Sequence, residues 1–155
     1  SKLEGDYSVF IKGLVMEKIY SKLEPNKLLH IVHRVHEFHT IEYDHRKDIV
    51  SEDEFLQLSS MKLGKGHTFK PHQHVWKDGE DKVIAQESWV VVNGSVECSF
   101  YDTDGTLLSK PILKQGDCSV TLGGGHTYLI LEDNTLVYEY KTGPYKGQEL
   151  DKVLI

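Results

Sequence analysis

The sequence has few cysteines, no excess of basic residues and no long apolar run. Two cysteines in 155 residues exclude a disulfide-stabilised miniprotein and fit a reducing compartment, so we expect a cytoplasmic protein. No apolar run approaches the ~20 residues that a membrane-spanning helix needs, which predicts no membrane span. The net charge of −6, without a basic stripe, makes nucleic acids and anionic membranes poor partners.

The composition fits one folded domain. Hydrophobic residues make up 39% and charged residues 27% of the chain, and the four prolines are scattered, so a core can form without disulfides. We expect residues 54–155 to form a β-barrel. Residues 1–53 are expected to form an N-terminal extension of strand and possible helix, packed on the barrel or on a dimer partner.

From about Glu54 onward, short runs rich in Val, Ile, Phe, Tyr and Thr alternate with turn signals, which predicts β-strands. Asn93-Gly94 is typical of a two-residue hairpin turn in which both positions can take positive φ. Many short strands separated by Gly-containing turns predict an all-β fold, an antiparallel barrel or jelly roll. The expected strands cover residues 87–92, 96–101, 109–113, 118–122, 127–131 and 135–141.

The extension is less regular. Residues 9–23 can be interpreted as a helix, although Gly13 disfavours one. Residues 28–38 are ambiguous between helix and strand, and we favour a strand.

Three histidines and one glutamate are the candidate metal ligands. His72 and His74 flank Gln73, and a strand would point both imidazoles to one face with Cα atoms roughly 7 Å apart. Glu87 opens the next expected strand, and His126 follows three glycines at the start of another. Three imidazoles and one carboxylate suit one divalent transition metal, Fe, Mn, Ni, Zn or Cu.

The spacing of these residues resembles the two motifs of the cupin superfamily. Five residues lie between Gly66 and His72-Gln73-His74, and six lie between Glu87 and Gly94; His126 falls in the second motif. Twelve residues separate His74 from Glu87, where the usual motif has three or four, so the intervening hairpin carries an insertion. The resemblance implies a double-stranded β-helix jelly-roll barrel.

Residues 54–147 also resemble the WbuC-type cupin-fold metalloproteins of bacterial surface-polysaccharide (O-antigen or capsule) gene clusters. The stretches that carry this resemblance include Phe69 to His74, Phe100 to Gly105 and the terminal Gly143-Pro144-Tyr145. It implies a role in polysaccharide synthesis and assigns no reaction.

The sequence therefore favours a metal-dependent enzyme of isomerase or epimerase type, with a small polar or nucleotide-activated sugar as substrate. His67 or Tyr128 would supply the acid or base. The alternatives are a sugar-binding or sensing protein without turnover and an Fe(II)-dependent dioxygenase. Because open sheet edges are commonly covered by a partner, we also expect a homodimer.

Two other features have simpler interpretations. Five histidines fall between positions 30 and 45, and neither a helix nor a strand would gather all of them on one face. They are His30, His33, His36, His39 and His45. We interpret them as a solvated edge, with a second metal site or a pH-sensitive contact as the alternative. Cys98 is expected to be a small buried apolar residue and not a nucleophile, because no base at fixed spacing accompanies it.

Overall fold

The computed structural model describes residues 16–77, 83–144 and 147–155. These residues form two compact units, the first ending at Ile41 and the second beginning at Glu42. In the part of the chain that is described, no helix is long and apolar enough to cross a membrane.

The first unit contains a β-hairpin and a short 3₁₀ helix. Strand β1 (Glu17–Tyr20) pairs antiparallel with β2 (Leu28–Val32), and η1 covers Val35–Thr40. The helix interpretation of residues 9–23 is wrong for β1, while residues 9–15 lie outside the described residues. The strand favoured over 28–38 ends at Val32, because the chain then turns into η1, where Phe38 is 1% exposed.

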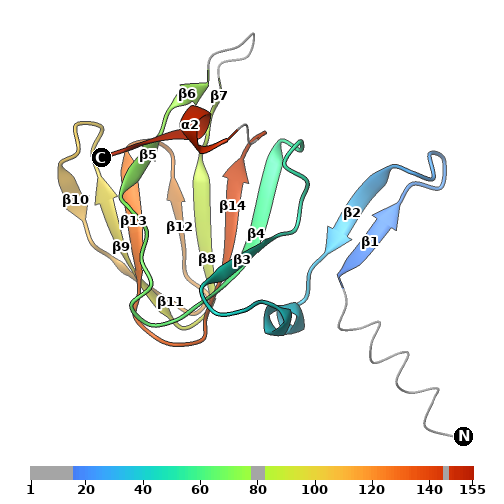
Figure 1. The fold of residues 1–155 in the computed structure, drawn as a ribbon, viewed down its shortest axis with the longest axis horizontal. Coiled ribbons are helices and arrows are strands. Elements are labelled where there is room, and N and C mark those ends of the chain that lie inside the picture. Colours follow the sequence, from blue (N-terminus) through green and yellow to red (C-terminus); the bar gives the residue numbers. More distant parts are fainter. Residues whose placement is uncertain (1–15, 78–82, 145–146) are drawn as a thin grey trace, which may run out of the picture. The chain divides into compact units, whose positions relative to one another are not determined.

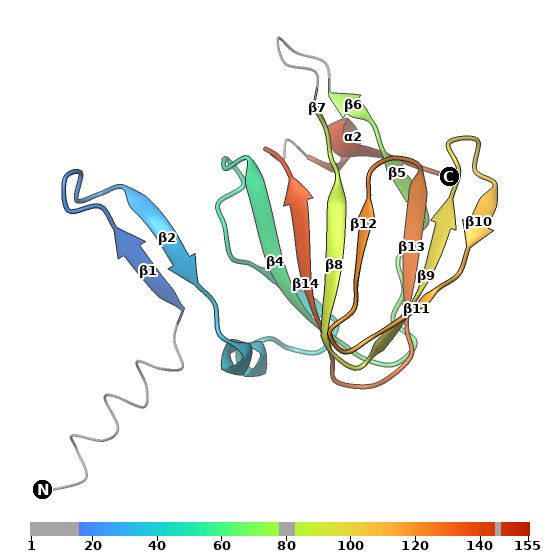
Figure 2. The ribbon, with the colours of Figure 1, turned by 180° about the vertical axis from the view of Figure 1, so that it is seen from behind.

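Two antiparallel sheets form the second unit (Figure 1). One has the strand order β12-β8-β14-β4-β3, and the other has the order β10-β9-β13-β5-β15, with β11 also paired to β9. Figures 1 and 2 show the short hairpin β6–β7 and helix α2 at the end of the barrel where β8 begins. The first sheet contains β3 (His45–Asp48), β4 (Leu56–Leu63), β8 (Glu87–Asn93), β12 (Cys118–Thr121) and β14 (Thr135–Thr142). The second contains β5 (His72–His74), β9 (Ser95–Tyr101), β10 (Leu107–Ser109), β11 (Ile112–Lys114), β13 (Gly125–Ile130) and β15 (Lys152–Leu154). The remaining elements are β6 (Trp76–Lys77), β7 (Val83–Ile84) and α2 (Gln148–Asp151).

Along the strands, side chains alternate between the barrel interior and the solvent. In β8, Glu87, Trp89 and Val91 are buried, since successive residues of a strand point to opposite faces. The interior is apolar over most of its length and polar where β8 begins. The apolar part contains Met61, Leu63, Trp89, Val91, Val96, Cys98, Leu113, Tyr128, Ile130 and Val137.

The predicted all-β architecture is confirmed, with two local differences. The strand expected over 109–113 is divided into β10 and β11, because Pro111 has no N–H to donate to a ladder; its carbonyl instead accepts a hydrogen bond from the Cys98 amide at 2.8 Å. At the hairpin turn, Gly94 has φ +85 whereas Asn93 does not have a positive φ.

Residues 42–53, assigned from sequence to the extension, belong structurally to the second unit. Strand β3 pairs antiparallel with β4, with Arg46 opposite Met61. This places Arg46 and Asp48 beside the polar end of the barrel.

Candidate metal centre

Four buried side chains converge at the polar end of the barrel. Each of them offers one ligand atom, and these atoms all lie within 4.8 Å of one another. The residues are His72, His74, Glu87 and His126, the same four singled out by the sequence. In the part of the chain that the structure describes, this is the one group of three or more His, Cys, Asp or Glu residues with such geometry.

The register of the sheets brings the four residues together. His72 and His74 are two positions apart on β5, so both imidazoles point to the barrel interior. Strand β13 pairs with β5 so that His126 lies directly opposite His72. Glu87 comes from β8 in the facing sheet. The centre is thus built from rigid strands of both sheets.

Each imidazole is oriented by a hydrogen bond on its outer nitrogen. This leaves every Nε2 facing the interior, where it can offer a lone pair to a metal ion once it carries no proton. The partners of the three Nδ1 atoms are the Lys70 carbonyl for His72 at 2.9 Å, Asp151 Oδ2 for His74 at 3.0 Å and Thr121 Oγ1 for His126 at 3.1 Å.

The inner atoms fit a cation. Glu87 Oε2 lies 2.5 Å from His126 Nε2 and 3.7 Å from His74 Nε2, and a buried carboxylate this close to imidazole nitrogens needs a proton or a cation beside it. The Nε2 atoms of His72 and His126 lie 3.2 Å apart, where two lone pairs repel each other unless a proton or a cation lies between them. Imidazole nitrogen with one carboxylate oxygen is the ligand set of Fe, Mn, Ni, Cu and Zn sites. The cluster therefore suits a transition-metal ion.

Burial and hydrogen bonds set the charges of the group. Burial lowers the pKa of His72 to about 4, which keeps this imidazole neutral. Burial also disfavours the charged form of Glu87, but hydrogen bonds from His126 and His74 outweigh it and lower the pKa well below its usual value. A neutral imidazole and an ionised carboxylate are the forms that bind metals. For His74, hydrogen bonds to Asp151 and Glu87 outweigh burial and raise the pKa to about 9, so this imidazole carries a proton at neutral pH that it would release on binding a metal ion.

A second carboxylate, missed in the sequence, lies behind Glu87. Glu139 on β14 is 7% exposed; its oxygens accept hydrogen bonds from Trp89 Nε1 at 3.0 Å and Arg46 Nη2 at 2.7 Å. Burial and then the charge of Glu87 raise its pKa. The available signal was the alternation in which Thr135, Val137 and Glu139 share one face.

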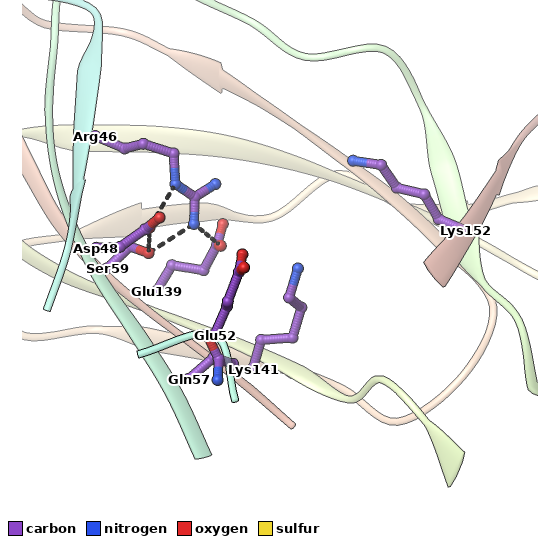
Figure 3. Close-up of a pocket in the computed structure, with 8 residues that line it drawn as sticks. All are labelled: Arg46, Asp48, Glu52, Gln57, Ser59, Glu139, Lys141 and Lys152. Atoms are coloured by element: carbon purple, nitrogen blue, oxygen red, sulfur yellow. Dashed lines mark hydrogen bonds and ion pairs between the residues drawn. The ribbon is translucent and has the colours of Figure 1, made fainter. Parts of the chain in front are cut away.

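A polar cavity of ≈ 240 Å³ opens beside Glu139 (Figure 3). A second cavity, of ≈ 490 Å³, reaches the candidate ligand His72. Lys152 lines both. The first is lined by Arg46, Asp48, Glu52, Gln57, Ser59, Glu139, Lys141 and Lys152.

The two acid–base candidates from sequence occupy different environments. The ring of Tyr128 stacks on Trp89 with centroids 3.8 Å apart and lies 5.3 Å from that of His126. Burial, with the charge of Glu87, raises the Tyr128 pKa well above its usual value. His67 Nδ1 lies 3.1 Å from Asp44 Oδ1, and its ring packs on Phe69. Neither residue lines the two cavities above.

Among the described residues, none of the five N-terminal histidines belongs to the one group with metal-ligand geometry. His33 Nε2 lies 3.7 Å from Glu37 Oε2, and its ring meets Phe38 edge-on. His45 Nδ1 lies 2.8 Å from the carbonyl of Tyr43.

Comparisons with known proteins agree on the fold. No protein-family model and no curated protein matches the sequence. Among solved structures, a conserved protein with a double-stranded β-helix domain from Klebsiella pneumoniae matches over 71% of this chain and 82% of its own, with 16% identity and a TM-score of 0.52. An oxalate decarboxylase variant from B. subtilis matches over 71% of this chain and 28% of its own, with 16% identity and a TM-score of 0.55.

The capsular polysaccharide assembling protein CapF from Staphylococcus aureus also matches. The alignment covers 71% of this chain and 31% of CapF, with 14% identity and a TM-score of 0.57. At such identities the likeness establishes architecture alone. With its two antiparallel sheets and these neighbours, the chain has a double-stranded β-helix fold.

Proposed function

We propose that this protein is a metal-dependent enzyme of isomerase or epimerase type that acts on a small sugar derivative in bacterial surface-polysaccharide synthesis. The observation that carries the proposal is the convergence of three Nε2 atoms and the Glu87 carboxylate at the end of the barrel that carries the polar cavity.

A divalent ion held by His72, His74, Glu87 and His126 would supply Lewis-acid chemistry, polarising a substrate carbonyl. The chain orients the three imidazoles through the Nδ1 bonds described above and keeps Glu87 ionised. Proton movement needs a further group, for which His67 and Tyr128 remain our candidates. Tyr128, whose pKa is raised, would donate a proton or hydrogen bond rather than accept one.

Two observations support the substrate class. The lining of the first cavity combines carboxylates, cationic groups, an amide and a hydroxyl, which match the donors and acceptors of a sugar. The sequence resembles proteins of surface-polysaccharide clusters, and CapF, whose fold is similar, is described as a capsular polysaccharide assembling protein.

The test is turnover of a panel of nucleotide sugars by protein loaded separately with Zn²⁺, Mn²⁺, Ni²⁺ and Fe²⁺. Isomerisation or epimerisation in D₂O would introduce solvent deuterium at the reacting carbon, which ¹H NMR detects. His126→Ala should lose turnover, whereas His39→Ala, at an exposed position, should retain it.

Other outcomes identify the alternatives. Binding without conversion across the panel would contradict an enzyme and indicate a sugar-binding or sensing protein. Oxygen uptake with Fe²⁺ and no isomerised product would indicate a dioxygenase.

We also propose that the protein is a homodimer. Strand β12 ends one sheet, and Val120 and Leu122 at this edge are 61% and 67% exposed. Unpaired edges with apolar side chains are commonly covered by a partner strand. A monomeric mass in analytical ultracentrifugation at micromolar concentration would contradict the proposal.

A further inference from the structure

The first cavity has cationic groups from three strands. Arg46 comes from β3, Lys141 from β14 and Lys152 from β15. Figure 3 shows Lys152 set apart from the other labelled residues, with its ammonium group directed toward Arg46. The three cations differ in how far their charge is already neutralised.

Arg46 is already paired with carboxylates of the protein. Its Nη2 donates to Glu139 Oε1 at 2.7 Å and to Ser59 Oγ at 2.7 Å, and its Nε lies 3.4 Å from Asp48 Oδ1. The Lys141 ammonium lies 3.6 Å from Asp151 Oδ2, and the Asp151 side chain is 1% exposed. These ion pairs neutralise the charges of Arg46 and Lys141 within the protein.

Lys152 is different. Within the described ranges, no hydrogen bond or ion pair joins its ammonium group to another residue, and its side chain lines both cavities. An ammonium that faces a cavity without a carboxylate partner is available to an anionic ligand.

The backbone fixes Lys152 near the metal centre. In the β15–β5 pair it is directly opposite His74, and opposite residues of an antiparallel pair project from the same face. An anion bound by Lys152 would therefore lie next to the ligand cluster.

On this basis we propose that the cavity binds an acidic sugar derivative, and that Lys152 pairs with its carboxylate or phosphate group. The Glu52 and Glu139 carboxylates of the same lining would accept hydrogen bonds from the sugar hydroxyls. This inference rests on the proposed function, because it names the substrate class of that site.

Matched ligands that differ in the acidic group provide the test. Glucose, glucuronate and glucose 1-phosphate are titrated into zinc-loaded protein by isothermal calorimetry, with inorganic phosphate as a separate ligand. We expect glucuronate or glucose 1-phosphate to bind about tenfold or more tightly than glucose, as a charge-assisted hydrogen bond in a half-buried site allows. Which of the two binds identifies the acidic group as carboxylate or phosphate.

Variants assign the preference to Lys152. Lys152→Met should abolish it, Lys152→Arg should keep most of it, and Lys114→Met on β11 should leave it unchanged. Circular dichroism and zinc content, measured on each variant, show that the fold and the centre persist. The inference is overturned if glucose binds as tightly as both anions, if none of the sugars binds at tens of millimolar, or if Lys152→Met keeps the preference. Inorganic phosphate binding as tightly as glucose 1-phosphate would also overturn it, because the sugar would then contribute nothing.

The two proposals fail in different ways. Protein that prefers anionic sugars but never holds a stoichiometric metal would contradict the metal-dependent function and leave the role of Lys152 standing. Protein that holds metal and turns over a neutral sugar would do the reverse.

Discussion

Asp151 orients the candidate metal ligand His74 from a distant part of the chain, and its removal tests that role quantitatively. Its Oδ2 lies 3.0 Å from His74 Nδ1, and its side chain is 1% exposed, so water cannot readily replace the bond. Carboxylate partners of metal-bound histidines are typically worth about 10- to 100-fold in metal affinity, or about 1.4–2.7 kcal/mol.

The two substitutions at this position should differ in size. Asp151→Asn keeps a neutral acceptor of the same shape, so we expect a loss of about tenfold in affinity. Asp151→Ala leaves Nδ1 without a partner, and the loss should approach about a hundredfold. Zn²⁺ affinity is measured by competition with a chromogenic chelator, with Asp53→Asn at an exposed position as the matched control. If both Asp151 variants bind zinc within twofold of the unchanged protein, the proposed role of this bond is wrong.

Two further predictions concern the barrel itself. Burial raises the pKa of the Cys98 thiol to about 12, so at pH 8 only about one molecule in ten thousand carries the reactive thiolate. After treatment with iodoacetamide, mass spectrometry should find the label on exposed Cys118 and not on Cys98. Equal labelling of the two cysteines in the folded protein would contradict this. Leu63 is 1% exposed, so Leu63→Ala should lower the free energy of unfolding by about 2–5 kcal/mol, whereas Leu108→Ala, at 62% exposure, should change it by less than about 0.5 kcal/mol in urea denaturation.

The convergence of the four candidate ligands could be predicted because a local rule and a family resemblance pointed to the same residues. The period of two along a strand fixes His72 and His74 on one face, and the spacing to Glu87 and His126 matches motifs of a known barrel. The long insertion between His74 and Glu87 did not disturb this, because the strands on either side keep their partners in the sheets.

The surroundings of the ligands could not be predicted in the same way. Asp151 and Arg46 reach the centre from segments that are 77 and 41 positions away in sequence from His74 and Glu87, respectively. No local pattern links such residues, since only the pairing of β15 with β5 and of β3 with β4 brings them near. Glu139 was the partial exception, because its inward position followed from the alternation along β14, although its partners did not.

Departures in local structure have similar causes. Strand β1 replaces an expected helix because residues 17–20 pair with β2, and tertiary pairing overrides weak helical preference. Residues 42–53 carry no clear strand signal in the sequence, since His45 to Asp48 are all polar. This composition suits an edge strand.

The most direct test of the account is the metal content of protein purified without an affinity tag. Inductively coupled plasma mass spectrometry should find one transition-metal ion per chain in the unchanged protein, and His72→Ala or Glu87→Ala should lose most of it while circular dichroism shows the β fold intact. A metal content far below one per chain after exposure to Fe²⁺, Mn²⁺, Ni²⁺, Cu²⁺ and Zn²⁺ in turn, or an unchanged content in both variants, would contradict the assignment of these residues as a metal centre.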